Sequence, residues 1–170
     1  LVGSEMCIRD RFDGGSFIYD NRGTIVCQFP QFLEKTEQVI FEQRKNGWVP
    51  LPELVAEIGS RESQDYKAVV LGLRDYVLKS NFHKVVIGLS GGIDSALVAV
   101  MAVDALGADN VVCLALPSKF NSSASLDDAK QLSENLGITL ETIGIQEIID
   151  KVDQRLAPLF QGCLLYTSDA

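Results

Sequence analysis

The sequence predicts an α/β protein in which a parallel sheet carries helices on both faces, preceded by a smaller β-rich segment. Short apolar runs rich in β-branched residues at 85–89, 111–116 and 138–145 alternate with longer segments of helical periodicity. This alternation is typical of βαβ units. At 170 residues, with 46% hydrophobic and 22% charged residues, the chain is long enough for one ordinary globular domain or parts of two.

The N-terminal part has the pattern of a hairpin followed by a linker. Residues 16–20 and 24–28 are short apolar runs, and Gly23 between them is suited to a turn with positive φ. Residues 31–45 carry mixed charge and predict no clear element. Proline and glycine then punctuate 49–64, which we expect to be an interdomain linker.

The helical segments are recognised by their periodicity and their ends. Apolar side chains recur at helical spacing in segments 66–77, 95–106, 129–136 and 146–156. Segment 95–106 is apolar almost all round, so we expect a buried helix that stops at Gly107. Ser125 and Asp128 have the spacing of a capping box before the third helix.

Composition excludes several classes of protein. The formal net charge of -8 argues against broad binding to nucleic acid or to a membrane surface. No apolar run reaches about 18 residues, so no transmembrane helix is expected. Cys27 and Cys113 lie in apolar, strand-like stretches without metal-ligand or disulfide spacing. We expect buried structural thiols and a cytoplasmic protein.

The two ends are expected to be sequencing-adaptor sequence. Residues 6–11 (MCIRDR) can be encoded by codons whose reverse complement encodes residues 163–168 (CLLYTS), so one inverted repeat in the DNA would account for both. The repeat resembles a transposon end used in sequencing libraries. We therefore expect 1–11 and 163–170 to be artefact, with the protein itself at 12–162.

A loop of serine and glycine between the strand predicted at 85–89 and the helix predicted at 95–106 is the candidate binding site. In open α/β sheets, ligands bind at the carboxyl ends of the strands, where residues 90–95 (SGGIDS) lie. Backbone N–H groups of 91–95 would be free donors at a helix N-terminus, and the hydroxyls of Ser90 and Ser95 would add donors. The carboxylate of Asp94 would repel phosphate unless it holds a divalent cation or caps local amides.

Two other phosphate-binding motifs do not fit this loop. No lysine follows the glycines, as a Walker A loop requires, and the glycine spacing is not G-x-G-x-x-G. A tight glycine-rich turn without a ligand stays open as an alternative.

The longer context of the loop carries a family resemblance. SGGIDS resembles the pyrophosphate loop of the ATP-pyrophosphatase superfamily, whose fold is adenine-nucleotide alpha-hydrolase-like. Segments 71–118 and 125–138 (SLDDAKQLSENLGI) are similar to glutamine-dependent NAD synthetases. Residues 12–32 (FDGGSFIYDNRGTIVCQFPQF) resemble the last strands of the nitrilase-type glutaminase domain that precedes the synthetase domain in that family. The resemblance covers nearly all of 12–162.

The resemblance implies how the chain is divided. Residues 12–48 would be the C-terminal tail of a nitrilase-like glutaminase domain, 49–64 the linker, and 65–162 the N-terminal half of an NAD synthetase domain. The glutaminase machinery and the rest of the deamido-NAD site would lie outside the chain. We therefore expect a fragment that is inactive alone.

The resemblance also implies an activity. The complete enzyme would be a ligase that amidates deamido-NAD to NAD through an adenylylated intermediate, with glutamine-derived ammonia and release of AMP and pyrophosphate. ATP would be the co-substrate, Mg²⁺ the metal, and the enzyme a homo-oligomer. Another ATP-pyrophosphatase synthetase, such as a GMP synthetase, and a non-catalytic ATP-binding module remain alternatives.

Site residues follow from the same resemblance, and none is assigned as catalytic. The implied ATP-binding residues are Gly88, Leu89, Ser90, Gly91, Gly92, Ile93, Asp94, Ser95 and Leu116. Asp94 would also bind magnesium. Residues 117–125 (PSKFNSSAS) match a second family loop, from which Asn121 and Ala124 depart, and suggest Ser118, Ser122 and Ser125 as substrate contacts. For Ser125, helix capping is the alternative role.

Overall fold

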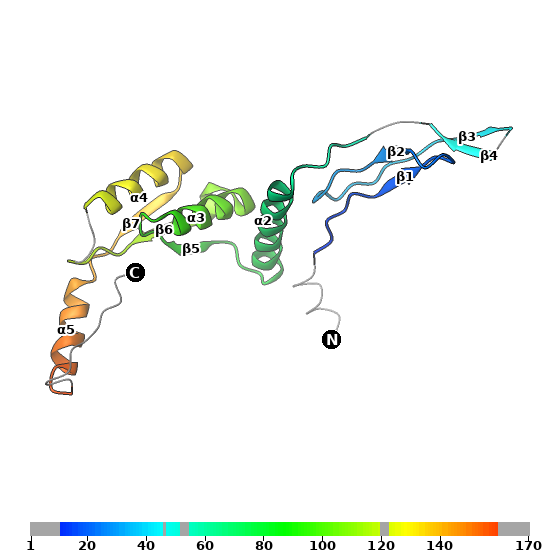
Figure 1. Cartoon of the computed structure of the whole chain (residues 1–170). Helices are drawn as coiled ribbons and strands as arrows, with labels where there is room; N and C mark the ends of the chain where they lie inside the picture. The colour runs from blue at the N-terminus through cyan, green and yellow to red at the C-terminus, as the bar shows by residue number, and fades with distance from the viewer. Residues whose placement is uncertain (1–10, 46, 52–54, 120–122, 160–170) are drawn as a thin grey trace. The chain divides into compact units, whose positions relative to one another are not determined.

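A computed structural model of the chain describes residues 11–45, 47–51, 55–119 and 123–159 (Figure 1). These residues fall into two compact units that meet between His83 and Lys84. Apart from Arg11, the two ends assigned to adaptor sequence lie outside the described residues. No helix within the described ranges is both long and apolar enough to cross a lipid bilayer.

The first unit combines two antiparallel hairpins with one long helix. Its described elements are β1 (Phe17–Tyr19), β2 (Ile25–Gln28), β3 (Phe41–Arg44), β4 (Gly47–Pro50) and α2 (Arg61–Lys79). The β1–β2 hairpin confirms the prediction for this stretch. Its turn is held by the Asp20 carboxylate, which accepts the N–H groups of Arg22 and Thr24 at 2.8 and 2.9 Å. Gly23 in this turn has a φ of +79°.

Two elements of the first unit differ from the sequence prediction. Hairpin β3–β4 was not predicted, because its first strand is exposed along its whole length and so shows no alternation of buried and exposed residues. Helix α2 starts at Arg61, earlier than the apolar periodicity indicates, because its first turn is polar. The hydroxyl of Ser60 accepts the N–H of Ser63 at 3.3 Å and caps this end.

The second unit alternates strands and helices as predicted. Its elements are β5 (Val85–Gly88), α3 (Ile93–Leu106), the 3₁₀ turn η1 (Ala108–Asn110), β6 (Val111–Ala115), α4 (Ser123–Leu136), β7 (Thr139–Thr142) and α5 (Gln146–Leu156). The strands form a parallel sheet in the order β5-β6-β7. The predicted α/β class and parallel sheet are confirmed.

Helices α3 and α4 both pack on one face of this sheet (Figure 1). Val111, Cys113 and Ala115 of the central strand point to that face and are fully buried, while the alternate residues of β6 are only half-buried. On the other face, the Val86 side chain is 64% exposed. The predicted helices on both faces are thus seen on one face within this unit.

Helix α3 contacts the sheet through a stripe of small residues. Ala99, Ala102 and Ala105 are buried, whereas Ile93 at the start of the helix is 81% exposed. The prediction of a buried helix therefore holds only along this alanine stripe, because the other residues of α3 are half-buried or exposed. Gly107, with a φ of +81°, ends the helix as predicted.

Candidate functional site

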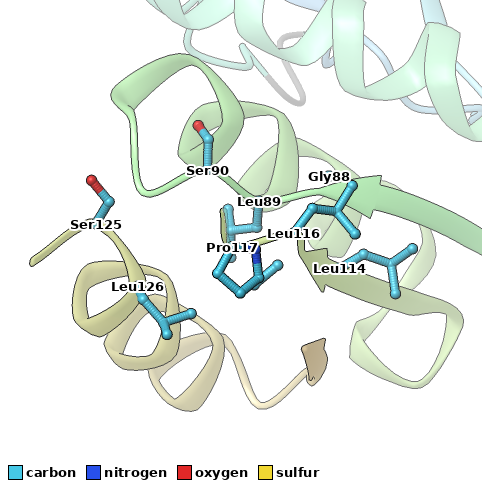
Figure 2. Close-up of a pocket in the computed structure, with 9 residues that line it drawn as sticks. Gly88, Leu89, Ser90, Leu114, Leu116, Pro117, Ser125 and Leu126 are labelled. Carbon is cyan, nitrogen blue, oxygen red and sulfur yellow. The ribbon is translucent and has the colours of Figure 1, made fainter. Parts of the chain in front are cut away.

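A pocket of about 220 Å³ opens at the carboxyl ends of β5 and β6. Its lining residues are Gly88, Leu89, Ser90, Leu114, Ala115, Leu116, Pro117, Ser125 and Leu126. Figure 2 shows the hydroxyls of Ser90 and Ser125 toward one end, with the side chains of Leu114 and Leu116 farther from it. The pocket thus has a polar end and an apolar wall. It brings together five of the residues proposed from sequence, which are Gly88, Leu89, Ser90, Leu116 and Ser125.

Strand pairing sets the position of the loop that forms the polar end. Gly88 is paired with Leu114, and the N–H of Leu89 donates to the carbonyl oxygen of Leu114 at 2.8 Å. Leu89 is 3% exposed, so it anchors the loop in the core. The loop therefore leaves the sheet at the last paired residue and has only a few residues before α3 begins.

The loop is held by its own hydroxyl groups. The Ser95 hydroxyl accepts the N–H of Ser90 at 3.2 Å and donates to the carbonyl oxygen of Gly92 at 3.0 Å. The Ser90 hydroxyl lies 3.0 Å from that of Ser95 and accepts the N–H of Gly92 at 3.3 Å. The expectation that Gly92 and both hydroxyls would be free donors is thus wrong here, because these groups satisfy one another within the loop.

The first turn of α3 still offers backbone donors. The first bond of the helix runs from the N–H of Ala96 to the carbonyl oxygen of Gly92 at 3.1 Å. Helix geometry leaves the N–H groups of Ile93, Asp94 and Ser95 without an intrahelical acceptor. These groups and the positive end of the helix dipole favour an anion beside the loop.

Gly91 brings the loop into contact with the first turn of α4. Its φ is +82°, and a Cβ atom at this position would lie 2.8 Å from both the Cα and the carbonyl carbon of Ser125, with the Ser125 oxygen closer still. Only glycine fits this approach. The N-terminal ends of α3 and α4 therefore lie together at the polar end of the pocket.

The predicted capping role of Ser125 is contradicted. Helix α4 begins at Ser123, so Ser125 lies within its first turn instead of preceding it. A residue at the N-cap must have non-helical backbone angles, which an internal position does not allow. Ser125 instead lines the pocket.

Asp94 is an exposed carboxylate in the first turn of α3. Among the described residues, no hydrogen bond or ion pair engages its side chain, and no group of three His, Cys, Asp or Glu residues could hold a metal ion. Magnesium commonly takes one or two protein carboxylates together with phosphate oxygens and water. A single carboxylate beside an anion site fits that pattern.

The loop after β6 is tied to the start of α5. The carbonyl oxygen of Pro117 accepts the N–H of Ile145 at 3.3 Å, and the N–H of Lys119 donates to Oε1 of Gln146 at 2.8 Å. Ser118 lies between these two contacts, and Ser122 lies outside the described residues. Gln146 was not a candidate from sequence, because a polar residue at a helix start carries no specific signal.

The two cysteines are buried as predicted. Cys27 is 1% exposed and Cys113 is 0% exposed, and both are free thiols. Burial raises the pKa of the Cys113 thiol above its ordinary value. Cys113 is thus a packing residue of the central strand.

An open parallel sheet whose carboxyl edge carries a glycine loop and a helix N-terminus defines an α/β domain suited to binding phosphorylated ligands. The sequence model of the family described as NAD synthase matches residues 65–162, and the chain belongs to that family.

Known relatives extend the match. The chain is 49% identical over 152 residues to the glutamine-dependent NAD(+) synthetase of Rhodobacter capsulatus, covering 89% of this chain and 27% of that protein. The chain thus spans about a quarter of the length of the curated relatives that it matches.

Solved structures agree with this relationship. The glutamine-dependent NAD+ synthetase from Acinetobacter baumannii, in complex with ADP, superposes with a TM-score of 0.85 at 34% identity, covering 91% of this chain and 29% of the other. The NH3-dependent NAD synthetase from Campylobacter jejuni, in complex with nitrate, gives a TM-score of 0.53 at 34% identity and covers 57% of this chain and 42% of the other.

Proposed function

We propose that the protein containing this chain is a glutamine-hydrolysing ligase that converts deamido-NAD to NAD. ATP adenylylates the nicotinate carboxylate of deamido-NAD with release of pyrophosphate, and glutamine-derived ammonia then displaces AMP. The observation that carries this proposal is the pocket beside a glycine loop in a chain of the NAD synthase family. A relative that binds ADP shares this architecture.

The geometry supports a division of ATP between the two parts of the site. The phosphates would lie at the polar end, against the backbone of 91–95 and the positive ends of α3 and α4. The adenine would lie along the apolar wall, where Leu114 and Leu116 are. Ser118 and Ser125 would face the second substrate, because Ser125 lines the pocket from the first turn of α4 and Ser118 directly follows Pro117, another lining residue.

Asp94 would hold magnesium together with the phosphate oxygens. When bound, the ion would neutralise charge on the phosphates as pyrophosphate leaves. The residues of this chain contribute positioning: the loop fixes the phosphates, and its N–H donors stabilise charge that develops on them. Because Asp94 has no other partner among the described residues, its carboxylate can serve this role without losing an existing contact.

We also propose that residues 12–48 belong to a nitrilase-like glutaminase domain, 49–64 to a linker and 65–162 to the synthetase domain. The extent of the two superpositions supports this division. The glutamine-dependent synthetase matches 91% of this chain, whereas the NH3-dependent synthetase matches 57%. The complete protein would be a cytoplasmic homo-oligomer.

The direct test expresses the complete gene and measures AMP and NAD formed from deamido-NAD and ATP, with glutamine or ammonia as nitrogen donor. NAD formation with both donors is the expected result. If NAD forms neither with glutamine nor with ammonia, the assignment is overturned. Amidation of xanthosine monophosphate instead would indicate a GMP synthetase, and ATP binding without pyrophosphate release a binding module.

A further inference from the structure

The side chain of Gln146 lies between the pocket loop and the body of α5. Its Oε1 accepts the N–H of Lys119 at 2.8 Å, and its Nε2 donates to Oδ1 of Asp150 at 2.7 Å. Both ends of the amide are therefore engaged, and the contact with Asp150 orients the amide so that its oxygen faces Lys119. A glutamine suits this place because it combines one acceptor and one donor group at the end of a flexible side chain.

The contact with Lys119 completes a pair of tethers on the loop. Two residues earlier, Pro117 lines the pocket, and its carbonyl oxygen accepts the N–H of Ile145. Consecutive residues at the start of α5 thus hold the loop on both sides of Ser118. A loop held at two points two residues apart has little freedom to leave the pocket wall.

We propose that Gln146 is a positioning residue for the nucleotide pocket, acting through the backbone of Lys119. By fixing the segment 117–119, it holds Pro117 and Ser118 at the edge of the pocket, so that the loop is in place before the ligand arrives. Preorganisation of this kind raises affinity because less ordering remains to be done on binding. The identity of the ligand as ATP rests on the proposed function, whereas the tether itself does not.

Two variants of the complete protein test the tether. Gln146→Ala removes both contacts. The double variant Gln146→Glu with Asp150→Asn keeps the total charge and reverses the second contact: the new carboxylate can accept the Lys119 N–H, and the new amide can donate to that carboxylate. It should therefore behave like the wild type.

The matched control is Gln131→Ala. Gln131 makes the same kind of contact one turn along an exposed helix face, from its Nε2 to Oδ1 of Asn135 at 3.2 Å. It lies on α4 and, among the described residues, has no hydrogen bond to the loop at 117–119. Any general effect of removing a surface glutamine will appear in this variant too.

The first readout is the rate of trypsin cleavage after Lys119, followed by mass spectrometry. Proteolysis of a locally opened segment tracks the population of the open form. One net hydrogen bond corresponds to a change of roughly two- to tenfold in that population. We expect such an increase for Gln146→Ala and none for the rescue or control variants. Unchanged cleavage in Gln146→Ala would overturn the proposal.

The second readout is the ATP concentration that half-protects this bond from trypsin, measured beside the KM for ATP and kcat. Gln146→Ala should raise the half-protecting ATP concentration and the KM for ATP by roughly two- to tenfold each. It should leave kcat within about twofold, since the loop acts in binding. Equal ATP dependence in Gln146→Ala and Gln131→Ala, or a wild type that ATP does not protect, would refute the positioning role. If the wild type is protected but forms no NAD, the proposed function fails while the positioning role stands.

Discussion

Gly91 and Ser125 approach each other so closely that a single added methyl group would overlap the backbone of Ser125. This contact joins the loop after β5 to the first turn of α4. Gly91→Ala should therefore push the two apart and weaken ATP binding by roughly 10- to 100-fold, the scale expected for displacements of about 1 Å in a binding site. Isothermal titration with ATP measures this effect.

Gly107→Ala is the control for backbone strain alone. Gly107 has a φ of +81°, almost the same as the +82° of Gly91, but a Cβ there meets no atom within 4 Å. Both variants should lose about 1–3 kcal/mol of stability, because a residue with a Cβ atom disfavours a positive φ. Only Gly91→Ala should lose affinity, and equal affinities in the two variants would show that the contact with Ser125 is unimportant.

Ser95→Ala should loosen the loop. The Ser95 hydroxyl contacts Ser90 and Gly92, and its loss leaves the loop without its central hydrogen-bonding group. We expect the free energy of unfolding to fall by about 1 kcal/mol and the ATP affinity to fall several-fold. Ser95→Thr keeps the hydroxyl and should retain most of both. Urea titration measures the first quantity; a threonine variant as weak as the alanine variant would contradict the role of the hydroxyl.

Asp94→Asn should reduce magnesium-dependent turnover about tenfold or more. Stability should fall by no more than about 1 kcal/mol, since the carboxylate contributes to folding only through the helix dipole. Glu62→Gln, in the first turn of α2, is the matched control and should leave turnover unchanged. Parallel loss of turnover and stability in Asp94→Asn would indicate a structural aspartate.

The turn of the β1–β2 hairpin should weaken in acid. Hydrogen bonds from the N–H groups of Thr24 and Arg22 lower the pKa of the Asp20 carboxyl below its ordinary 3.8. A lowered folded-state pKa contributes stability that is present above the ordinary value and lost as the pH falls below it. The protection factor of the Thr24 amide, which is its intrinsic exchange rate divided by its observed rate at the same pH, should therefore fall below about pH 4. Asp20→Asn should remove this dependence; an unchanged pH profile in that variant would exclude Asp20 as its source.

Alkylation of Cys113 should require unfolding. Burial raises the pKa of this thiol from its ordinary 9.0, so the reactive thiolate is rare in the folded unit. At pH 8, iodoacetamide should label the Cys113 peptide slowly in buffer and rapidly in urea. Equal labelling rates under the two conditions would mean that β6 opens readily in the native protein.

Prediction from sequence succeeded for helices and strands that bury one face, because their apolar residues recur at regular spacing. The strands β5 and β6, the end of α3 at Gly107 and the exact span of α5 all follow from apolar spacing and helix-stop signals. Prediction failed for hairpin β3–β4 because its first strand is exposed along its whole length, so no alternation of buried and exposed residues reports on it. It also failed for the extent of α3 burial, which depends on how much of the helix surface the sheet covers.

The candidate site was located from the SGGIDS segment, but its internal contacts were not. Approach of Gly91 to Ser125 depends on the packing of α3 against α4, which no local pattern encodes. The role of Gln146 depends on a hydrogen bond to Lys119, 27 residues away in the chain. A sequence motif therefore identifies the loop, whereas its partners come from tertiary packing.

The hydrogen bond from Leu89 to Leu114 has a consequence for how the protein can tolerate insertions and deletions. Both pocket loops begin within two residues of this bond, so their alignment is set by the register of β5 and β6. One residue inserted in either strand would shift one loop by about 3.3 Å and turn the following side chains to the opposite face. Changes in length are therefore expected in exposed turns such as that at Gly23, and not in these two strands.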